Sequence, residues 1–214
     1  QIFRIQANAN NQPTTIDTAT VANGQFSFKG SVEQIDVNFL FVEGEQVNTP
    51  FIVEEGIIEV NLLQERLAEM NLAGTPSNND LQTYREETKT FADNLNAIAS
   101  EIQAANSLGD NILVQDLQQQ YTDMQADLID YEKGFIKTNV DSYISALILE
   151  RFLNQKTLPR NEVKEIFSTY SDRIRSSKSG INVSNIVNAP VNPTAIGEIA
   201  PLFDGPRLGL PLMK

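Results

Sequence analysis

The sequence contains no histidine, no cysteine and no tryptophan. The missing cysteine excludes a thiol nucleophile, a disulfide, a Cys-x-x-Cys redox pair and a thiolate zinc site within these 214 residues. The missing histidine removes the usual general base near neutral pH and the commonest transition-metal ligand. Carboxylates, lysine, tyrosine, serine and threonine are the groups that remain for catalysis, so most reaction classes are closed to this chain.

Basic residues and long apolar runs are also scarce. The 16 Lys and Arg stand against 28 Asp and Glu, which gives a formal net charge of −12. We therefore expect no nucleic-acid partner, because phosphate binding needs clustered positive charge, and no docking on an anionic membrane surface. No run of about 18 apolar residues occurs, so we expect no membrane insertion. Hydrophobic residues still make up 41% of the chain, enough to bury a core.

The N-terminal third alternates between polar and apolar residues and has frequent turn residues, which is typical of β-strands. Asn23-Gly24 before the alternating Phe26 and Phe28 is a strong hairpin signal, because a type I′ turn needs positive φ at both central positions. We therefore predict an antiparallel β domain over residues 1–72, either a sandwich or a small barrel.

The pattern changes at residues 73–80, where Gly, Pro, Ser and Asn mark a boundary and Asn79 or Asp80 is expected to cap a helix. Two apolar stripes with three- and four-residue spacing follow, joined by a Gly-containing turn at 107–111. The first stripe comprises Leu81, Tyr84, Thr88, Phe91, Leu95, Ile98, Ile102 and Ala105. The second comprises Leu117, Tyr121, Met124, Leu128, Tyr131 and Phe135. We predict an antiparallel hairpin over about 80–139, with a coiled coil to another chain as the alternative.

The rest of the chain also has helical patterns. Residues 141–155 are apolar nearly all round, which is typical of a buried helix, and Asp141 or Ser142 is the expected N-cap. Short amphipathic helices are expected over 159–187, which completes a helical domain over 73–187. The predicted fold class is therefore α+β, a β domain followed by an all-α region.

No group of residues meets the requirements of a catalytic, cofactor-binding or metal site, so we expect none. Glu54 and Glu55 are neighbours on a strand, so their side chains point to opposite faces and are expected to be solvated. The other acidic candidates lie on polar helix faces or lack the ligand pattern of a calcium loop: Glu86, Glu87, Asp110, Asp116, Asp123, Asp127 and Asp130. A carboxylate-dependent hydrolase is accordingly the weakest hypothesis.

Two short motifs complete the candidates. Residues 176–180 (SSKSG) lack the leading glycine and the spacing of a phosphate-binding P-loop. We interpret them as a helix end, with Lys178 near the terminal carbonyls and Gly180 as the residue after the C-cap. Residues 182–184 (NVS) match the glycosylation pattern, which matters only in a eukaryotic secretory setting.

Six segments resemble, in order, one known family. They are IDTATVANGQFSFKG (16–30), FIVEEGIIEV (51–60), GTPSNNDLQTY (74–84), FIKTNVDSYISALIL (135–149), SSKSGINVSNIV (176–187) and IGEIAPLF (196–203). Together they resemble the cell-envelope thiol–disulfide oxidoreductases of Gram-negative bacteria. These proteins carry a thioredoxin-like (AhpC/TSA or redoxin) domain behind an N-terminal module of unknown function. Val140 stands where proline is common in this family.

The resemblance implies that residues 188–214 are a linker and the first strand of a thioredoxin-like domain absent from this sequence. The family's catalytic cysteine pair would lie after Lys214, so none of its catalytic residues transfers to this chain. The implied function is a non-catalytic module of an enzyme of cell redox homeostasis, active in disulfide reduction or isomerisation. The module would position or dimerise the redox domain, or select its substrate proteins.

The resemblance also bears on partners and location. Substrate proteins of the parent and a second copy in a homodimer are the implied partners. The implied location is the periplasm or cell envelope, with a lipid anchor on a missing N-terminal segment as an option. An envelope binding or assembly module without a redox role is the alternative function.

Overall fold

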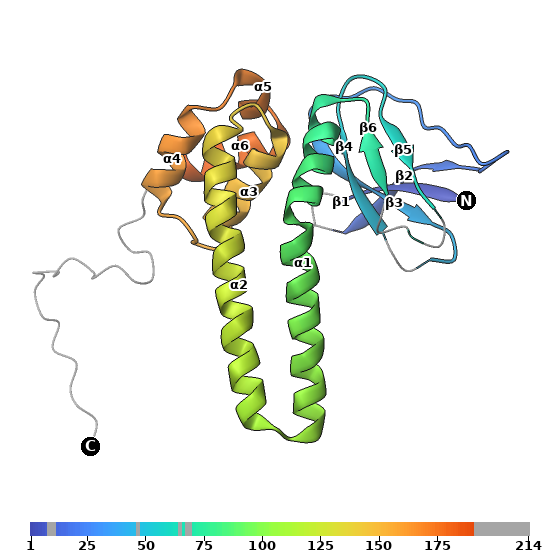
Figure 1. Cartoon of the computed structure of the whole chain (residues 1–214). Helices are drawn as coiled ribbons and strands as arrows, with labels where there is room; N and C mark the ends of the chain where they lie inside the picture. Colours follow the sequence, from blue (N-terminus) through green and yellow to red (C-terminus); the bar gives the residue numbers. More distant parts are fainter. Residues whose placement is uncertain (8–11, 46–47, 64–65, 67–69, 191–214) are drawn as a thin grey trace, which may run out of the picture.

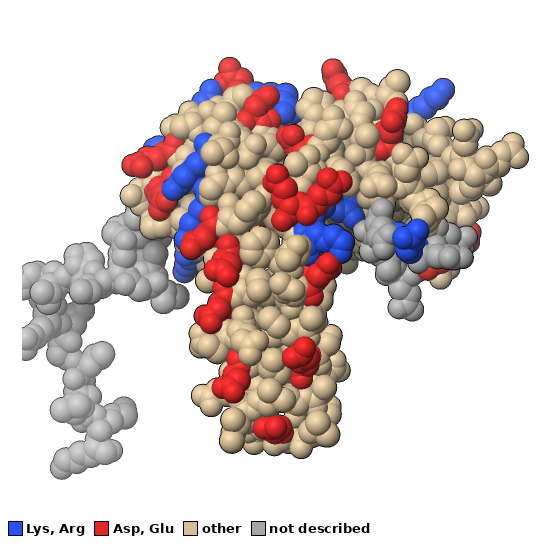
Figure 2. Space-filling view, in the orientation of Figure 1, with Lys and Arg blue, Asp and Glu red and all other residues tan. Residues whose placement is uncertain are grey.

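The computed structural model describes residues 1–7, 12–45, 48–63, 66 and 70–190. Within them it has the predicted α+β class, because antiparallel β-structure is followed by six helices (Figure 1). Two long helices project from a body made of the sheets on one side and four shorter helices on the other (Figures 1 and 2).

Four antiparallel strands form the main sheet, in the order β2-β1-β3-β4. Their bounds are Ile2–Ala7 (β1), Pro13–Ala19 (β2), Asp36–Val42 (β3) and Asn48–Val53 (β4). A second sheet pairs β5 (Glu59–Asn61) with β6 (Asn71–Ala73). The predicted antiparallel β-structure is therefore present, and within the described residues its strands form two separate sheets rather than a closed barrel.

The turn predicted at Asn23-Gly24 is confirmed, with φ of 52° at Asn23 and 74° at Gly24. The strand predicted after it is not formed, since Phe26 and Phe28 lie in a segment without ladder pairing. Their rings pack edge to face instead, with centroids 5.9 Å apart. The prediction was wrong because alternation describes which face a residue would occupy, whereas a strand also needs a neighbour for its backbone hydrogen bonds.

The long helices α1 (Pro76–Leu108) and α2 (Asn111–Thr138) form the predicted hairpin. At 33 residues, α1 is about 50 Å long. Gly109 ends α1 in the left-handed region with φ of 72°, and Asp110 caps α2 by accepting a hydrogen bond from the Leu113 N–H at 3.1 Å. The predicted turn is therefore confirmed, and Asp110 has a capping role.

The two predicted stripes line the inside of the hairpin, so they pair within this chain. Tyr84 packs edge to face on Phe135 with ring centroids 5.4 Å apart, and Phe91 lies 6.0 Å from Tyr131. The side chains of both stripes are buried or half-buried, whereas the remaining positions of both helices are mostly exposed. The hairpin thus buries one stripe per helix and leaves its outer faces in solvent.

Helix α1 begins at Pro76 with Thr75 as the N-cap, so the prediction of Asn79 or Asp80 was wrong. Proline is favoured in the first helical turn because its missing N–H has no acceptor there. The side chain of Asn78 serves the sheet instead, since it accepts from the Ile52 N–H at 2.9 Å and donates to the Ile52 carbonyl at 2.7 Å. Asn78 therefore covers the outer edge of β4, which has no neighbouring strand.

Four shorter helices follow: α3 (Tyr143–Asn154), α4 (Arg160–Ser168), α5 (Asp172–Arg175) and α6 (Lys178–Asn188). The predicted burial of α3 is confirmed, because Tyr143, Ala146 and Leu149 have no exposed surface. Its N-cap is Ser142. The buried apolar residues form one cluster that runs from Ile2 on the sheet to Val187 on α6.

Within residues 176–180, Ser176 is the C-cap of α5, but the interpretation of Gly180 as the residue after a C-cap was wrong, because Lys178 and Gly180 lie in the first turn of α6. Ser177 is the N-cap, and its Oγ accepts from the Gly180 N–H at 3.2 Å. Gly180 lies against the end of α5, where an added Cβ would be 2.1 Å from the carbonyl oxygen of Ile174. This close approach, rather than a left-handed C-cap, requires glycine. The predicted strand at 196–203, with most of the linker, lies outside the described residues.

Candidate functional site

Glu54 is buried, so the prediction that it is solvated was wrong. It directly follows β4 and is 6% exposed. Its carboxylate accepts hydrogen bonds from the Ser77 N–H at 2.6 Å and the Ser77 Oγ at 2.7 Å, and the Arg173 Nη1 lies 3.2 Å away. A carboxylate at a helix N-terminus is stabilised by the free N–H groups there. Glu55 is exposed, as predicted.

The Glu54 pair extends into a network that joins the sheet to the helices. Arg173 on α5 also donates to the Asp141 carbonyl, and its Nε lies 3.3 Å from Asp141 Oδ1. The hydrogen bond from Ser171 lowers the pKa of Asp141, and Arg173 adds to this effect. The network thus connects β4, α1, the α2–α3 loop and α5. Its carboxylates are engaged in hydrogen bonds, which indicates a structural role rather than acid–base chemistry.

A second polar contact holds α6 against the main sheet. The Lys178 Nζ lies 2.6 Å from Asp36 Oδ2, and the Gln6 side chain donates to the same oxygen at 2.6 Å. The Lys178 N–H donates to the Ile35 carbonyl at 3.2 Å. The ammonium group of Lys178 is therefore bound to the carboxylate of Asp36 on the sheet.

A buried carboxylate at the base of the hairpin was missed by sequence reasoning. Glu132 on α2 is 1% exposed. The Tyr84 hydroxyl donates to its Oε1 at 2.5 Å, and the Arg151 Nη2 lies 2.5 Å from Oε2 as an ion pair without hydrogen-bond alignment. The signal in the sequence was its spacing, since Glu132 stands between Leu128 and Ile136 in one helical row of otherwise apolar residues.

The raised pKa values of four tyrosines lead us to expect a loss of stability at alkaline pH. Burial raises the pKa of Tyr84, Tyr131, Tyr143 and Tyr170, in the case of Tyr143 to about 12. The unfolded chain therefore ionises first, so this stabilisation is complete below pH 10 and is lost as the pH rises toward the folded-state pKa values. We expect the midpoint of urea unfolding to fall above pH 10, together with delayed tyrosinate absorbance in the native chain. A constant midpoint would contradict this.

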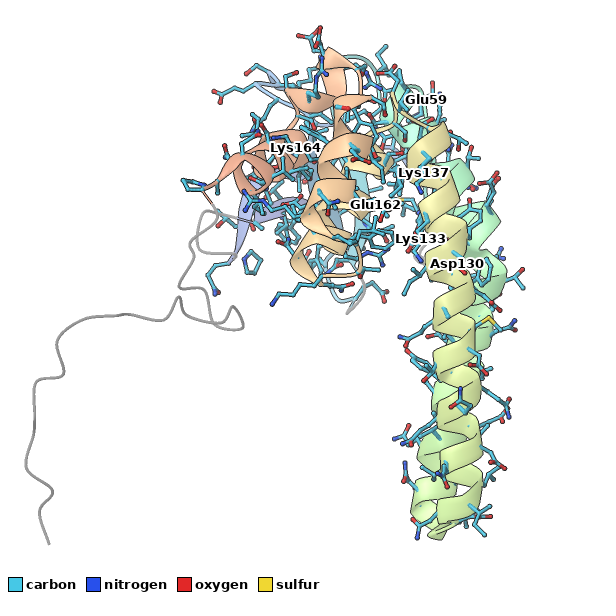
Figure 3. The ribbon with its side chains drawn as sticks, turned by 90° about the vertical axis from the view of Figure 1, so that its left-hand side faces the viewer. Glu59, Asp130, Lys133, Lys137, Glu162 and Lys164 are labelled. Atoms are coloured by element: carbon cyan, nitrogen blue, oxygen red, sulfur yellow. The ribbon has the colours of Figure 1, made fainter. Side chains whose placement is uncertain are left out.

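The other acidic candidates lie in solvent and do not converge. Glu86 accepts from Gln82, Glu87 from Tyr131 and Asp123 from Gln119, each on or across the hairpin surface. Asp130 pairs with Lys133 at 2.9 Å on the exposed side of α2 (Figure 3). Asp116 and Asp127 are also exposed. In the part of the chain that the structure describes, no three carboxylates are arranged to hold a metal ion.

Two further side-chain pairs fasten the helical region. Lys137 on α2 lies 3.5 Å from Glu162 on α4 (Figure 3). Asn182, in the glycosylation pattern, donates to Glu150 on α3 at 2.7 Å from within α6. The Asn182 amide thus holds two helices together, a role that does not require a glycan.

The outer part of the hairpin carries charge of one sign. No lysine or arginine occurs between Lys89 and Lys133, whereas seven exposed acids do: Asp93, Glu101, Asp110, Asp116, Asp123, Asp127 and Asp130. Figure 2 shows acidic groups without basic ones on the lower part of the projecting helices. The resulting negative potential attracts basic groups and repels a second copy of the same surface.

The end of the hairpin exposes apolar side chains. Leu108 is 83% exposed and Ile112 is 78% exposed, on either side of the turn, and Leu113 is also exposed. We refer to these three residues as the hairpin tip. An apolar group at the far end of an otherwise polar projection is the feature of the described surface that best fits contact with another protein.

Residues 2–81 match the model of a family described as a domain of unknown function (DUF4369). The match spans both sheets and the first residues of α1, which is less than half of the chain. No curated protein and no solved structure matches the chain. None of the helices in the described ranges is long and apolar enough to cross a membrane.

Proposed function

We propose that this chain is a non-catalytic binding module that holds protein partners with its hairpin. The observation that carries the proposal is the hairpin tip, presented about 50 Å along α1 from the sheets. Its apolar side chains favour contact with an apolar area on the partner, and the surrounding acids favour a partner with lysine or arginine around that area. Repulsion between two acidic hairpins favours substrate proteins over a homodimer formed through these faces.

We further propose that the module serves a thioredoxin-like thiol–disulfide oxidoreductase of the cell envelope. The support is the order of the six sequence segments, together with the domain of unknown function at their N-terminal end. The module would bring substrate proteins to a redox domain that supplies the cysteines. An envelope assembly module without redox chemistry is favoured by the same hairpin tip, which needs no cysteine to bind.

The experiment uses the full gene product in two disulfide-reduction assays, one with insulin and one with scrambled ribonuclease, a basic protein with non-native disulfides. Exchanging the cysteines of a Cys-x-x-Cys pair for serine is expected to abolish both activities. The double substitution Leu108→Ser and Ile112→Ser is expected to preserve insulin reduction and to weaken ribonuclease reduction about 30-fold, since two lost apolar contacts of ~1 kcal/mol each amount to ~2 kcal/mol. Raised salt is expected to weaken only the ribonuclease reaction.

The matched control is Ile181→Ser with Ile186→Ser, which removes exposed apolar side chains from α6 instead of the hairpin tip. It is expected to leave both assays unchanged. Equal loss in both double variants would refute the hairpin as the binding site. A gene product without a cysteine pair that still binds ribonuclease through the hairpin tip would favour the assembly module over the redox role.

A further inference from the structure

An open cavity of about 1240 Å³ lies against the inner face of the main sheet. Its walls come from β1, β3 and β4, from residues 19–32 and from the segment that contains β5. Much of the apolar wall is formed by Phe26, Phe28, Leu40, Phe51, Val53 and Val60. The volume exceeds the ~300–1,000 Å³ typical of small-molecule sites, so the cavity has room for an extended ligand.

Arg4 on β1 lines this cavity, and among the described residues it forms no ion pair. Its Nε is buried and has no hydrogen-bond partner among the described residues. In the sheet, Arg4 stands opposite Leu40 on β3 and Asp17 on β2. The Asp17 carboxylate accepts from the Thr18 N–H at 2.8 Å and forms no ion pair with Arg4. The buried Nε–H lacks a hydrogen-bond acceptor, and a bound anion would supply one.

The other charged residues around the cavity do not neutralise Arg4. Glu54 is engaged by Ser77 and Arg173. Lys29 and Glu59 are exposed. The cavity therefore combines aromatic and aliphatic side chains with polar ones such as Gln25 and Ser27, and with an arginine that forms no ion pair among the described residues.

We propose that this cavity binds a single-chain amphiphile with an anionic carboxylate head, of the long-chain fatty acid class. The planar guanidinium of Arg4 is suited to a carboxylate, which it can bind through two parallel hydrogen bonds. The acyl chain then lies along Phe26, Phe28 and Phe51, where its burial removes apolar surface from water. A neutral ligand would leave the Arg4 charge unpaired. The site is distinct from the hairpin, so this proposal stands or falls independently of the proposed partner binding.

The test is calorimetric titration of the chain with oleate and with oleyl alcohol, which has the same chain without the charge. We expect oleate to bind at least ~10-fold more tightly, because charge-assisted hydrogen bonds contribute more than neutral ones. Arg4→Met is expected to remove this preference and to leave binding of the alcohol unchanged. Asp17→Asn, the matched control on the neighbouring strand, is expected to keep or strengthen oleate binding.

The thermal midpoint of Arg4→Met separates a binding role from a structural one. Because Arg4 has no partner in the unliganded chain, its replacement is expected to raise the melting temperature or leave it unchanged. A lowered melting temperature would assign Arg4 a structural role and overturn the proposal. The absence of oleate binding to the unaltered chain would overturn the proposal as well. So would equal affinity of the unaltered chain for oleate and for oleyl alcohol. An apolar peptide that binds in the cavity and is not displaced by oleate would also overturn the proposal.

Discussion

Replacing Gly180 with alanine is expected to lower the free energy of unfolding by ~3 kcal/mol or more. The added Cβ would lie 2.1 Å from the carbonyl oxygen of Ile174 and 2.8 Å from that of Arg175. Both atoms belong to the backbone of α5, so no side-chain rotation relieves the contact. Helix α6 must move away from α5. This movement also lengthens the ion pair between Lys178 on α6 and Asp36 on the sheet.

The matched control for this prediction is Gly134→Ala, four residues before the C-terminal end of α2. No atom lies within 4 Å of the position that a Cβ would take at Gly134. Alanine has the higher helix propensity, so this substitution is expected to stabilise the chain by ~0.5–1 kcal/mol. Chemical denaturation of both variants measures the difference. Equal effects of the two substitutions would contradict the proposed contact between α6 and α5.

Replacing Arg151 with methionine is expected to lower the free energy of unfolding by about 3 kcal/mol. Glu132 is 1% exposed and would keep only the hydrogen bond from Tyr84. A buried carboxylate without its cation is strongly unfavourable, and Arg151, with 43% of its side chain exposed, is the one cation within 4 Å of Glu132 in the described structure. We place the cost at the lower end of the range for buried pairs because water reaches one partner.

The control for Arg151→Met is Lys133→Met, which removes a cation from α2 at the position next to Glu132. Lys133 pairs with the exposed Asp130, and such surface pairs contribute less than ~1 kcal/mol. Adding Glu132→Leu and Tyr84→Phe to Arg151→Met is expected to restore much of the lost stability, because the polar groups that lose their partners are then all removed. If the triple variant is less stable than Arg151→Met alone, the cost does not come from an uncompensated charge.

The helical hairpin is the element best predicted from the sequence. Its stripes meet within one chain because the connection at Gly109 and Asp110 is too short for any arrangement other than antiparallel neighbours. Local spacing and local turn chemistry therefore contained the necessary information. The turn at Asn23-Gly24 was predictable for the same reason, since the φ angles at a turn depend on the turn residues themselves.

The errors share a different physical cause. Glu54 and Gly180 were placed from their nearest neighbours in sequence, whereas Ser77, Arg173 and Ile174 decide their environment across distances that no local pattern describes. The segment with Phe26 and Phe28 has the alternation of a strand and lacks a partner strand. The cavity beside it, and the unpaired Arg4, follow from how two sheets face each other and had no signature in the sequence.

The sequence by itself determined the α+β class, the hairpin with its facing stripes, the one-sign charge of its outer part and the absence of cysteine and histidine chemistry. These properties depend on composition and on periodicity over a few helical turns or strand residues. Only the tertiary structure decided which carboxylates are buried, which glycine is needed for packing and which cation lacks a partner. Burial and pairing depend on residues distant along the chain, and the chain must fold before they meet.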